Sequence, residues 1–332
     1  MGAPRPWLEG WGYRKSHEID GSTVGAQTDY HVPIAVHRTT GTDSGGDVYV
    51  GTKCLADFGD IRFTTDDAVT LIVPWLEGYS GGVAYFWVKM DSLPDSPDAA
   101  TIYVYYGKAD ATSASTESRE DFTGYTEVEE IDDIQKTAYH VDFADRRDRT
   151  TYLYRDYTAD HFSDFADHLN IKRVTHGTSS WLAHILMADV VKGQKQMRDD
   201  HDEMFYVAVG GTTPKITVYE WDSGGNHYYC DPELTGTLTL GTMYYLSLRK
   251  YGASLILDTY TTIAKRHAGG DGDFGHQTLT LTVDYSFRYN YAGNSHDSGH
   301  AYVGSSDLEN LLFRKYVDPE PSNGAWGTEE SA

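Results

Sequence analysis

The stretch GVAYFWVKMDSLPDSPDAATIYVYYG, residues 82–107, decides the fold class. It contains two runs of β-branched and aromatic residues, 82–90 and 101–107, on either side of a turn with Pro94 and Pro97. Such residues favour the pleated, half-buried surface of a strand, and proline marks the turns between strands. The stretch therefore predicts two strands joined by a turn.

The same rhythm of short apolar runs and turns continues along the chain. Upstream, residues 30–37 predict a strand whose Pro33 favours either a sheet edge or a bulge. Residues 181–191 fit either a short helix or a buried strand. Further strand-like runs lie at residues 151–154, 166–174, 204–209, 215–220, 243–249, 254–260 and 277–283. We therefore predict an all-β protein of two antiparallel, jelly-roll-like β-sandwich domains in tandem.

Changes in composition divide the chain into segments. Residues 111–121 are rich in Ala, Ser, Thr and charge, which is typical of a linker. We predict one sandwich domain over residues 1–110 and a second over residues 122–317. Residues 318–332 open with Asp-Pro-Glu-Pro, so we expect an extended or disordered tail.

The charge of the chain excludes some partners. The formal net charge is −23 and the pI is about 4.8, so the protein repels phosphate, and we expect neither nucleic acid nor anionic membranes to bind. Asp outnumbers Glu and Lys is scarce, a pattern that favours a protein adapted to high salt. An acidic mesophilic protein and a calcium-rich extracellular protein are the alternatives.

The cysteines and the first residues limit the cellular setting. Cys54 and Cys230 fall in different predicted domains, so we expect two free, buried thiols rather than a disulfide framework. Residues 1–6, MGAPRP, do not begin an apolar signal segment, and no apolar run has membrane-spanning length. We expect a soluble chain that is made in the cytoplasm.

Four motifs in the first half carry a resemblance to a known family. They are Trp11–Lys15 (WGYRK), Cys54 with Asp57–Phe63 (DFGDIRF), Phe86–Lys89 (FWVK) and Ile102–Gly107 (IYVYYG). In this order they resemble an uncharacterised domain that is common in archaeal surface proteins and in viruses of archaea and bacteria. The resemblance implies a fold and a surface or virus setting, and it implies no chemistry.

A second resemblance covers the rest of the chain. The strand rhythm, the segment Tyr154–Phe162 and the later segment Ser305–Leu311 resemble a concanavalin A-like or laminin-G-like jelly roll. Such modules bind glycans or serve as spacers, so the resemblance implies one of these roles for residues 122–317.

Enzyme activity is not what the residues predict. Glucanases of concanavalin-like folds use a Glu-x-Asp-x-x-Glu run, whose carboxylates act as nucleophile and acid. The corresponding run here, Glu130–Gln135, ends in Gln135 where the acid is needed. We therefore expect no catalytic residues, and a glycan-cleaving enzyme is the least favoured alternative.

Acidic turns offer the candidate metal ligands. Asp43 and Asp47 lie in a glycine-rich turn, and Asp271 and Asp273 lie in a second one. Carboxylate oxygens on flexible loops suit calcium, which is the one cofactor that the sequence suggests. The alternative is that these residues cap turns or form a solvated acidic surface.

Aromatic residues beside polar loops offer the candidate glycan contacts. Trp181, Trp221, Tyr228 and Tyr229 border such loops, and Trp221 precedes the polar run Asp222–His227. Glycan binding needs exposed ring faces with polar groups nearby. The alternative is that these rings are core residues, as most aromatics in a sandwich are.

The function predicted from these features is structural. We expect a non-catalytic decoration or host-attachment protein, of turret or tail-fibre type, on the particle of a tailed virus of a halophilic host. Its expected partners are further copies of itself, other virion proteins and a host glycan or glycoprotein. The first alternative is a secreted or cell-surface, lectin-like adhesion protein of a haloarchaeon, which would be extracellular.

Overall fold

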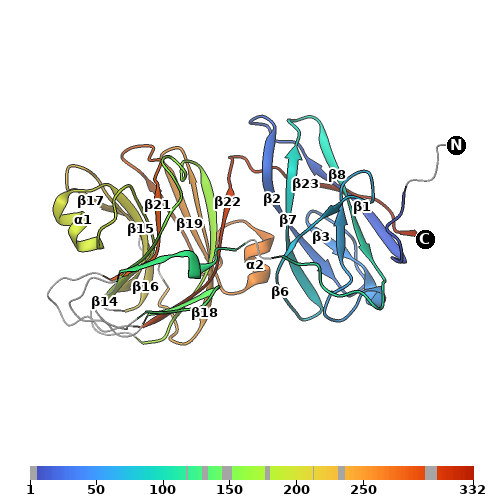
Figure 1. Cartoon of the computed structure of the whole chain (residues 1–332), viewed down its shortest axis with the longest axis horizontal. Helices are drawn as coiled ribbons and strands as arrows, with labels where there is room; N and C mark the ends of the chain where they lie inside the picture. The colour runs from blue at the N-terminus through green and yellow to red at the C-terminus, as the bar shows by residue number, and fades with distance from the viewer. Residues whose placement is uncertain are drawn as a thin grey trace. The chain divides into compact units, whose positions relative to one another are not determined.

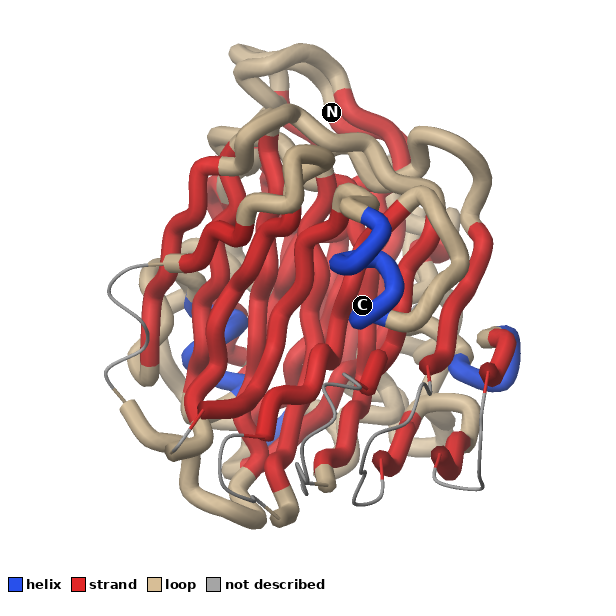
Figure 2. Tube along the Cα trace, turned by 90° about the vertical axis from the view of Figure 1, so that its left-hand side faces the viewer, coloured by secondary structure: helices blue, strands red, loops and turns tan. Residues whose placement is uncertain are grey.

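The computed structural model describes most of the chain. The described residues are 6–116, 119–128, 134–143, 152–175, 180–211, 213–230, 236–295 and 305–332. Strands make up most of this trace, and helices are confined to short pieces (Figure 2). The protein is all-β, as the sequence predicts. None of the helices in these ranges is long and apolar enough to span a membrane.

The chain forms two compact units. Unit 1 consists of Met1–Ser118 and Val317–Ala332, and unit 2 consists of Arg119–Tyr316. Unit 2 is therefore an insertion in unit 1, which both begins and ends the chain. The boundary near residue 118 falls within the stretch whose composition suggested a linker.

Unit 1 contains two sheets (Figure 1). The first has the order β23 (Asn323–Trp326), β1 (Tyr13–Asp20), β8 (Ala99–Tyr106), β4 (Arg62–Thr64) and β5 (Leu71–Ile72), with β24 (Glu330–Ser331) also on β1. The second has the order β3 (Asp47–Tyr49), β2 (Gln27–His37), β7 (Val83–Leu93) and β6 (Trp75–Ser80), and the 3-10 turn η1 covers Gly51–Lys53. Every pair is antiparallel except the parallel pair of β2 and β3.

The core of unit 1 draws on both sheets. Ile102 and Val104 of β8 and Ile34 and Val36 of β2 belong to one cluster of fully buried apolar residues. The alternation of strand side chains puts every second residue on the inner face of its sheet. The two sheets therefore bury a shared apolar layer, which is the construction of a β-sandwich.

Part of the segment 318–332, which was predicted to be an extended or disordered tail, instead joins a sheet. Residues 323–326 form β23, which pairs antiparallel with β1, and residues 330–331 form β24 on the same strand. Trp326 packs against the core of unit 1. The prolines at 319 and 321 keep only the preceding segment irregular, and the residues after them supply the outer edge of a sheet.

Unit 2 is a larger sandwich of two seven-stranded sheets. The back sheet has the order β10 (Ile134–Lys136), β11 (His140–Phe143), β22 (Ser306–Lys315), β13 (Phe165–Arg173), β18 (Met243–Tyr251), β19 (Ser254–Tyr260) and β20 (Gly275–Thr280). The front sheet has the order β17 (His227–Tyr229), β16 (Lys215–Trp221), β15 (Met204–Gly211), β14 (Ser180–Ala188), β21 (Tyr289–Ser295), β12 (Tyr152–Asp156) and β9 (Thr126–Val128). The helices are α1 (Gln194–Asp200), α2 (Ile263–Ala268) and the 3-10 turn η2 (Phe122–Gly124).

Apolar residues of both sheets fill the space between them. Leu169 and Leu246 from the back sheet and Val207 and Ile216 from the front sheet belong to one buried cluster. Residues 181–188, which fit a helix or a buried strand, belong to the central strand β14. Residues 184–188 of this run are buried whichever face they point to, because this part of the front sheet carries a further layer outside.

A glutamine closes one side of the sandwich of unit 2. The side chain of Gln277 in β20 donates to the carbonyl of Ile216 at 3.1 Å and accepts from the backbone NH of Val218 at 3.3 Å. Both partners lie on β16, next to the place where the short strand β17 ends. The side chain thus satisfies backbone groups that an edge strand leaves unpaired.

Candidate functional site

A row of aromatic side chains crosses the outer face of the front sheet. Cross-strand pairing aligns one residue from each of six adjacent strands, from β17 to β12. In order they are Tyr229, Tyr219, Tyr206, Leu186, Tyr291 and Tyr154. Their neighbours in sequence, such as Val207 and Ala292, face the core between the sheets. The row therefore lies on the side away from that core.

Alternation in the sequence places further rings beside this row. Aromatic residues recur two positions apart in Tyr152/Tyr154, Tyr219/Trp221, His227/Tyr229 and Tyr289/Tyr291. Because strand side chains alternate between faces, both members of each pair lie on the same face. This period-two pattern is the sequence signal that could have revealed the face. Only Trp221 and Tyr229 of these residues were predicted from the borders of polar loops.

The rings at the β17 end form a stack. His227 lies between Tyr219 and Trp221, with ring centroids 4.9 and 4.6 Å apart and interplanar angles of 8° and 20°. Burial, with a smaller contribution from the charge of Arg198, lowers the pKa of His227. The imidazole thus stacks on two rings, although His227 itself remains exposed.

Helix α1 and the loop before it cover the middle of the row. Met197 of α1 is fully buried against these rings. The hydroxyl of Tyr291 donates to the carbonyl of Val190 at 2.5 Å and accepts from the backbone NH of Lys192 at 3.2 Å. Tyr206 and Tyr291 are consequently buried, and the rings that reach solvent lie at the two ends of the row.

Two of the predicted glycan contacts point to opposite faces. Tyr229 is 50% exposed and pairs with Tyr219 on the outer face. Tyr228 is 37% exposed and pairs with Glu220, so it lies on the other face of the short edge strand. Its hydroxyl donates to the carboxylate of Asp222 at 3.2 Å. The structure thus places Tyr229 and Trp221 on one face of the sheet and Tyr228 on the other.

The remaining predicted contacts are less accessible. Trp221 is half-buried, with His227 on its ring and the guanidinium of Arg198 5.9 Å from its centroid. Trp181 lies in β14 opposite Gly210, and its side chain lies outside the described part of the chain. Tyr229 is therefore the predicted residue whose ring is best placed to meet a ligand.

The first predicted calcium pair is bound to basic side chains. Asp43 accepts from the ammonium of Lys15 at 2.6 Å and from the backbone NH of Tyr49 at 2.7 Å. Asp47 forms a 2.5 Å contact with the Nε2 atom of His37. The two carboxylates thus hold different side-chain partners, Lys15 and His37, and a calcium ion would have to displace both.

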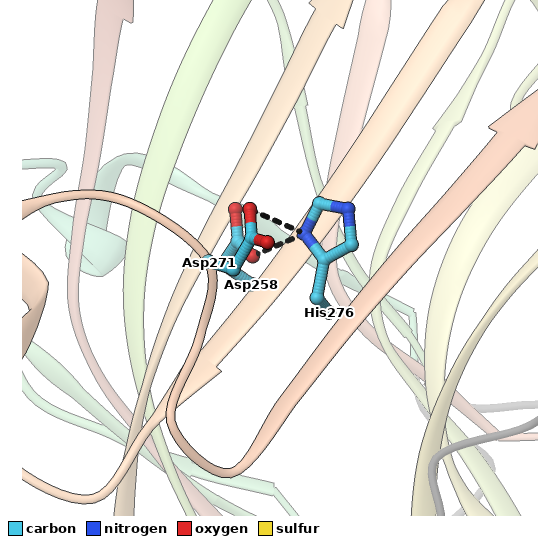
Figure 3. A group of neighbouring side chains, drawn as sticks. All are labelled: Asp258, Asp271 and His276. Atoms are coloured by element: carbon cyan, nitrogen blue, oxygen red, sulfur yellow. Dashed lines mark hydrogen bonds and ion pairs between the residues drawn. The ribbon is translucent and has the colours of Figure 1, made fainter.

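The two carboxylates of the second predicted calcium pair, Asp271 and Asp273, also contact different partners. Asp273 accepts from the ammonium of Lys265 and from Thr261. Asp271 instead meets the Nδ1 atom of His276 at 3.4 Å, and His276 also contacts Asp258 at 2.7 Å (Figure 3). The potential ligand atoms of Asp258, Asp271 and His276 lie within 4.8 Å of one another. Sequence reasoning missed Asp258 and His276.

The oxygens of Asp258 are nevertheless already occupied. One accepts from the backbone NH of Gly272 at 2.9 Å and meets His276, and the other pairs with the guanidinium of Arg249. The carboxylate is fully buried, and Arg249 brings a fixed positive charge to it. This arrangement fits an internal ion-pair network better than a metal site, because the arginine would repel the ion.

The catalytic run considered from the sequence is mostly outside the described residues. Glu130, Asp132 and Asp133 lie outside the described residues. Gln135 is exposed in the edge strand β10. The structure therefore adds no carboxylate geometry for this run.

Comparison with known families gives one match. Residues 57–181 match the family model described as "Domain of unknown function (DUF2341)". The match begins in unit 1 and ends in β14 of unit 2. It includes Asp57–Phe63, Phe86–Lys89 and Ile102–Gly107, and it leaves out Trp11–Lys15 and Cys54. No curated protein matches the sequence.

Solved structures match with low identity. A functionally unknown protein from Saccharomyces cerevisiae is 9% identical over 59% of this chain and 99% of its own, with a TM-score of 0.39. The carbohydrate binding module CBM66 from Bacillus subtilis is 11% identical over 58% and 96%, with a TM-score of 0.37. Tailspike protein 2 from the Escherichia coli O157:H7 bacteriophage CAB120 is 8% identical over 61% and 27%, with a TM-score of 0.40.

Proposed function

We propose that the protein is a non-catalytic glycan-binding module that serves in attachment. The observation that carries the proposal is the aromatic outer face of the front sheet, which ends in the half-exposed ring of Tyr229. A flat ring that reaches solvent can stack on the apolar face of a sugar, and sugar rings combine such faces with many hydroxyl groups. Nothing in this role requires a catalytic group.

The hairpin that leads into β17 carries polar groups that suit the hydroxyl groups of a sugar. The hairpin between β16 and β17 is ordered by Asp222, which accepts from the backbone NH groups of Gly224 and Asn226 and from the side chain of Asn226. These hydrogen bonds lower the pKa of Asp222, so its carboxylate stays ionised at neutral pH. The hairpin therefore presents carboxylate and amide groups that need no rearrangement before they bind.

The setting that we propose is the particle of a tailed virus of a halophilic host. The net charge of −23 is easiest to tolerate where salt screens the repulsion between acidic groups. A secreted or cell-surface adhesion protein would have the same composition. Detection of the protein in purified virus particles supports the first setting, and its recovery only from host envelopes supports the second.

Replacement of Tyr229 tests the glycan proposal. The Tyr229→Ala variant should bind an array of surface polysaccharides about tenfold more weakly, because one stacking contact contributes roughly 1–1.5 kcal/mol. Tyr79→Ala is the matched control, because Tyr79 is 52% exposed and lies in unit 1. Equal binding by both variants, or release of reducing sugar from the bound polysaccharide, would contradict a non-catalytic site at Tyr229.

Calcium remains a separate prediction. If Asp43 and Asp47 bound the ion, chelation would lower the melting temperature of the protein. We expect no such change, because these carboxylates already contact Lys15 and His37. A calcium-dependent rise in melting temperature that Asp43→Asn abolishes would instead support calcium binding at this pair.

A further inference from the structure

The other end of the aromatic row also reaches solvent. Tyr154 of β12 and Tyr289 of β21 are half-buried, and their rings meet edge to face with centroids 6.0 Å apart. Tyr152 and Tyr291 are buried beside them and support the two rings. Within the described residues, no group forms a hydrogen bond with the hydroxyl of Tyr154 or Tyr289. Two tyrosines with available hydroxyls therefore stand together on a rigid sheet.

An ion pair borders these two rings. Arg288 donates from Nε to Oδ1 of Asp156 at 2.7 Å and from Nη2 to Oδ2 at 2.6 Å. The guanidinium lies 5.1 Å from the ring of Tyr289, and the backbone NH of Arg288 donates to Asp189. Asp156 is opposite Tyr289 in the strand register. Both charged side chains are 43% exposed, so the pair offers planar polar groups without net charge.

We propose that Tyr154, Tyr289, Asp156 and Arg288 form a second glycan-binding site, which we call the tyrosine patch. The rings supply a surface for the apolar face of a sugar, and the tyrosine hydroxyls and the ion pair supply donors and acceptors for its hydroxyl groups. The ligand class rests on the proposed function, whereas the position of the site rests on these four residues alone.

The size and charge of the tyrosine patch favour a neutral glycan over other ligands. A stable protein partner buries about 800 Å² on each side, far more than two half-buried rings provide. An anionic ligand would meet the field of a chain with a net charge of −23. A neutral sugar meets neither obstacle, because it needs only a ring surface and a few well-oriented hydrogen-bonding groups.

The tyrosine patch and Tyr229 lie at opposite ends of one row. Five strand steps of about 4.8 Å separate β17 from β12, which gives about 24 Å between the two ends. Helix α1 and the loop before it cover the part of the row between these two ends. A short oligosaccharide can therefore occupy only one end, whereas a polysaccharide surface can engage both and gain avidity.

Binding experiments on the full chain test this proposal. The probes are neutral polysaccharides such as mannan, xylan and β-glucan, with a short oligosaccharide of whichever binds. We expect two equivalents of oligosaccharide per chain in the unaltered protein. The Tyr154→Ala/Tyr289→Ala variant should bind one equivalent and should bind the polysaccharide at least tenfold more weakly, and Tyr79→Ala should change neither.

A second variant guards against loss of folding. Asp156→Asn with Arg288→Gln leaves the rings in place and removes only the exposed ion pair, and it should also bind one equivalent. A single equivalent in the unaltered protein that Tyr229→Ala abolishes would overturn the tyrosine patch and leave the proposed function standing. Two equivalents that survive in both tyrosine-patch variants would likewise overturn it. Absence of binding to every polysaccharide would overturn the proposed function as well.

Discussion

The imidazole of His17 lies flat on the indole of Trp326, with ring centroids 3.7 Å apart and an interplanar angle of 12°. The two residues are opposite each other in β1 and β23, more than three hundred positions apart in the chain. His17 also contacts Oδ1 of Asn323 at 2.9 Å. The C-terminal strand is thus attached to unit 1 by a ring stack, a side-chain hydrogen bond and backbone pairing.

We expect Trp326→Ala to destabilise unit 1 by about 1–3 kcal/mol, because it removes a half-buried aromatic contact at the sheet edge. Chemical denaturation followed by circular dichroism measures the change. Trp326→Phe retains a ring and should restore most of the loss. If Trp326→Ala left the free energy of unfolding unchanged, the strand would contribute little to stability.

Acidification should weaken the same contact. Burial lowers the pKa of His17 below its ordinary value of 6.5, although Asn323 and the carbonyl of Ala325 partly oppose the shift. The unfolded chain therefore binds a proton at His17 more readily than the folded chain does, so stability falls as the pH drops below about 6.5. In His17→Gln this part of the pH dependence should disappear from melting curves recorded between pH 7 and 5. An unchanged pH profile would contradict the assignment.

A buried carboxyl in unit 2 should have the opposite pH dependence. Asp167 is buried on the core face of β13, where one oxygen accepts from the backbone NH of Leu248 and the other has no partner within the described residues. Burial raises its pKa to about 8. The folded chain holds the proton over a pH range in which the unfolded chain has released it, so stability falls between about pH 4 and pH 8.

Asp167→Asn should remove this loss and stabilise unit 2 at pH 8 by up to a few kcal/mol, at about 1.4 kcal/mol for each unit of pKa shift. Urea denaturation of the two proteins at pH 5 and pH 8 measures the difference. The variant should gain far more at pH 8 than at pH 5. Equal effects at both pH values would mean that Asp167 does not titrate in this range.

Lys250 should act as an internal cation that holds loops together. Its side chain is fully buried, and its ammonium donates to the carbonyls of Ser163 and Gly252 at 2.6 and 2.9 Å and to Asp284 at 2.8 Å. Lys250→Met keeps the apolar stem but leaves these acceptors unsatisfied, so we expect a loss of about 1–3 kcal/mol. Lys195→Met, at an exposed ion pair, is the control and should be near neutral. Equal losses would contradict the special role of Lys250.

Salt should stabilise the protein if its acidity is an adaptation to high salt. Screening reduces the mutual repulsion of acidic groups in a chain with a net charge of −23. We expect the melting temperature to rise steadily from low to molar sodium chloride. A melting temperature that is insensitive to salt would remove the main support for a halophilic host.

The strands could be predicted because runs of β-branched and aromatic residues between turns are local features of the sequence. The run from Val83 to Met90 forms most of β7, and Thr101–Tyr106 of the second run form most of β8. The helices α1 and α2 were missed, since each is shorter than eight residues and relies on tertiary contacts such as the burial of Met197. Residues 318–332 were misjudged because the partner of β23 is β1, which no local pattern identifies.

The candidate site was predictable only in part. Tyr229 was found because it follows a polar loop, but the row that it ends depends on the order of six strands in space. The WGYRK motif illustrates the same limit. Trp11 donates to the carbonyl of Asp60, and Arg14 packs against Trp7 and Tyr103. These contacts give the motif a structural role that its amino-acid sequence alone does not predict.

The insertion of unit 2 into unit 1 sets an order for assembly during synthesis. Unit 2 is one continuous segment, so all its strands are synthesised before β23 and β24. Unit 1 begins first but lacks the outer edge of a sheet until β23 and β24 emerge. We expect the nascent chain to hold β1 with an open edge while the inserted sandwich folds. The unit that is begun first is thus completed last.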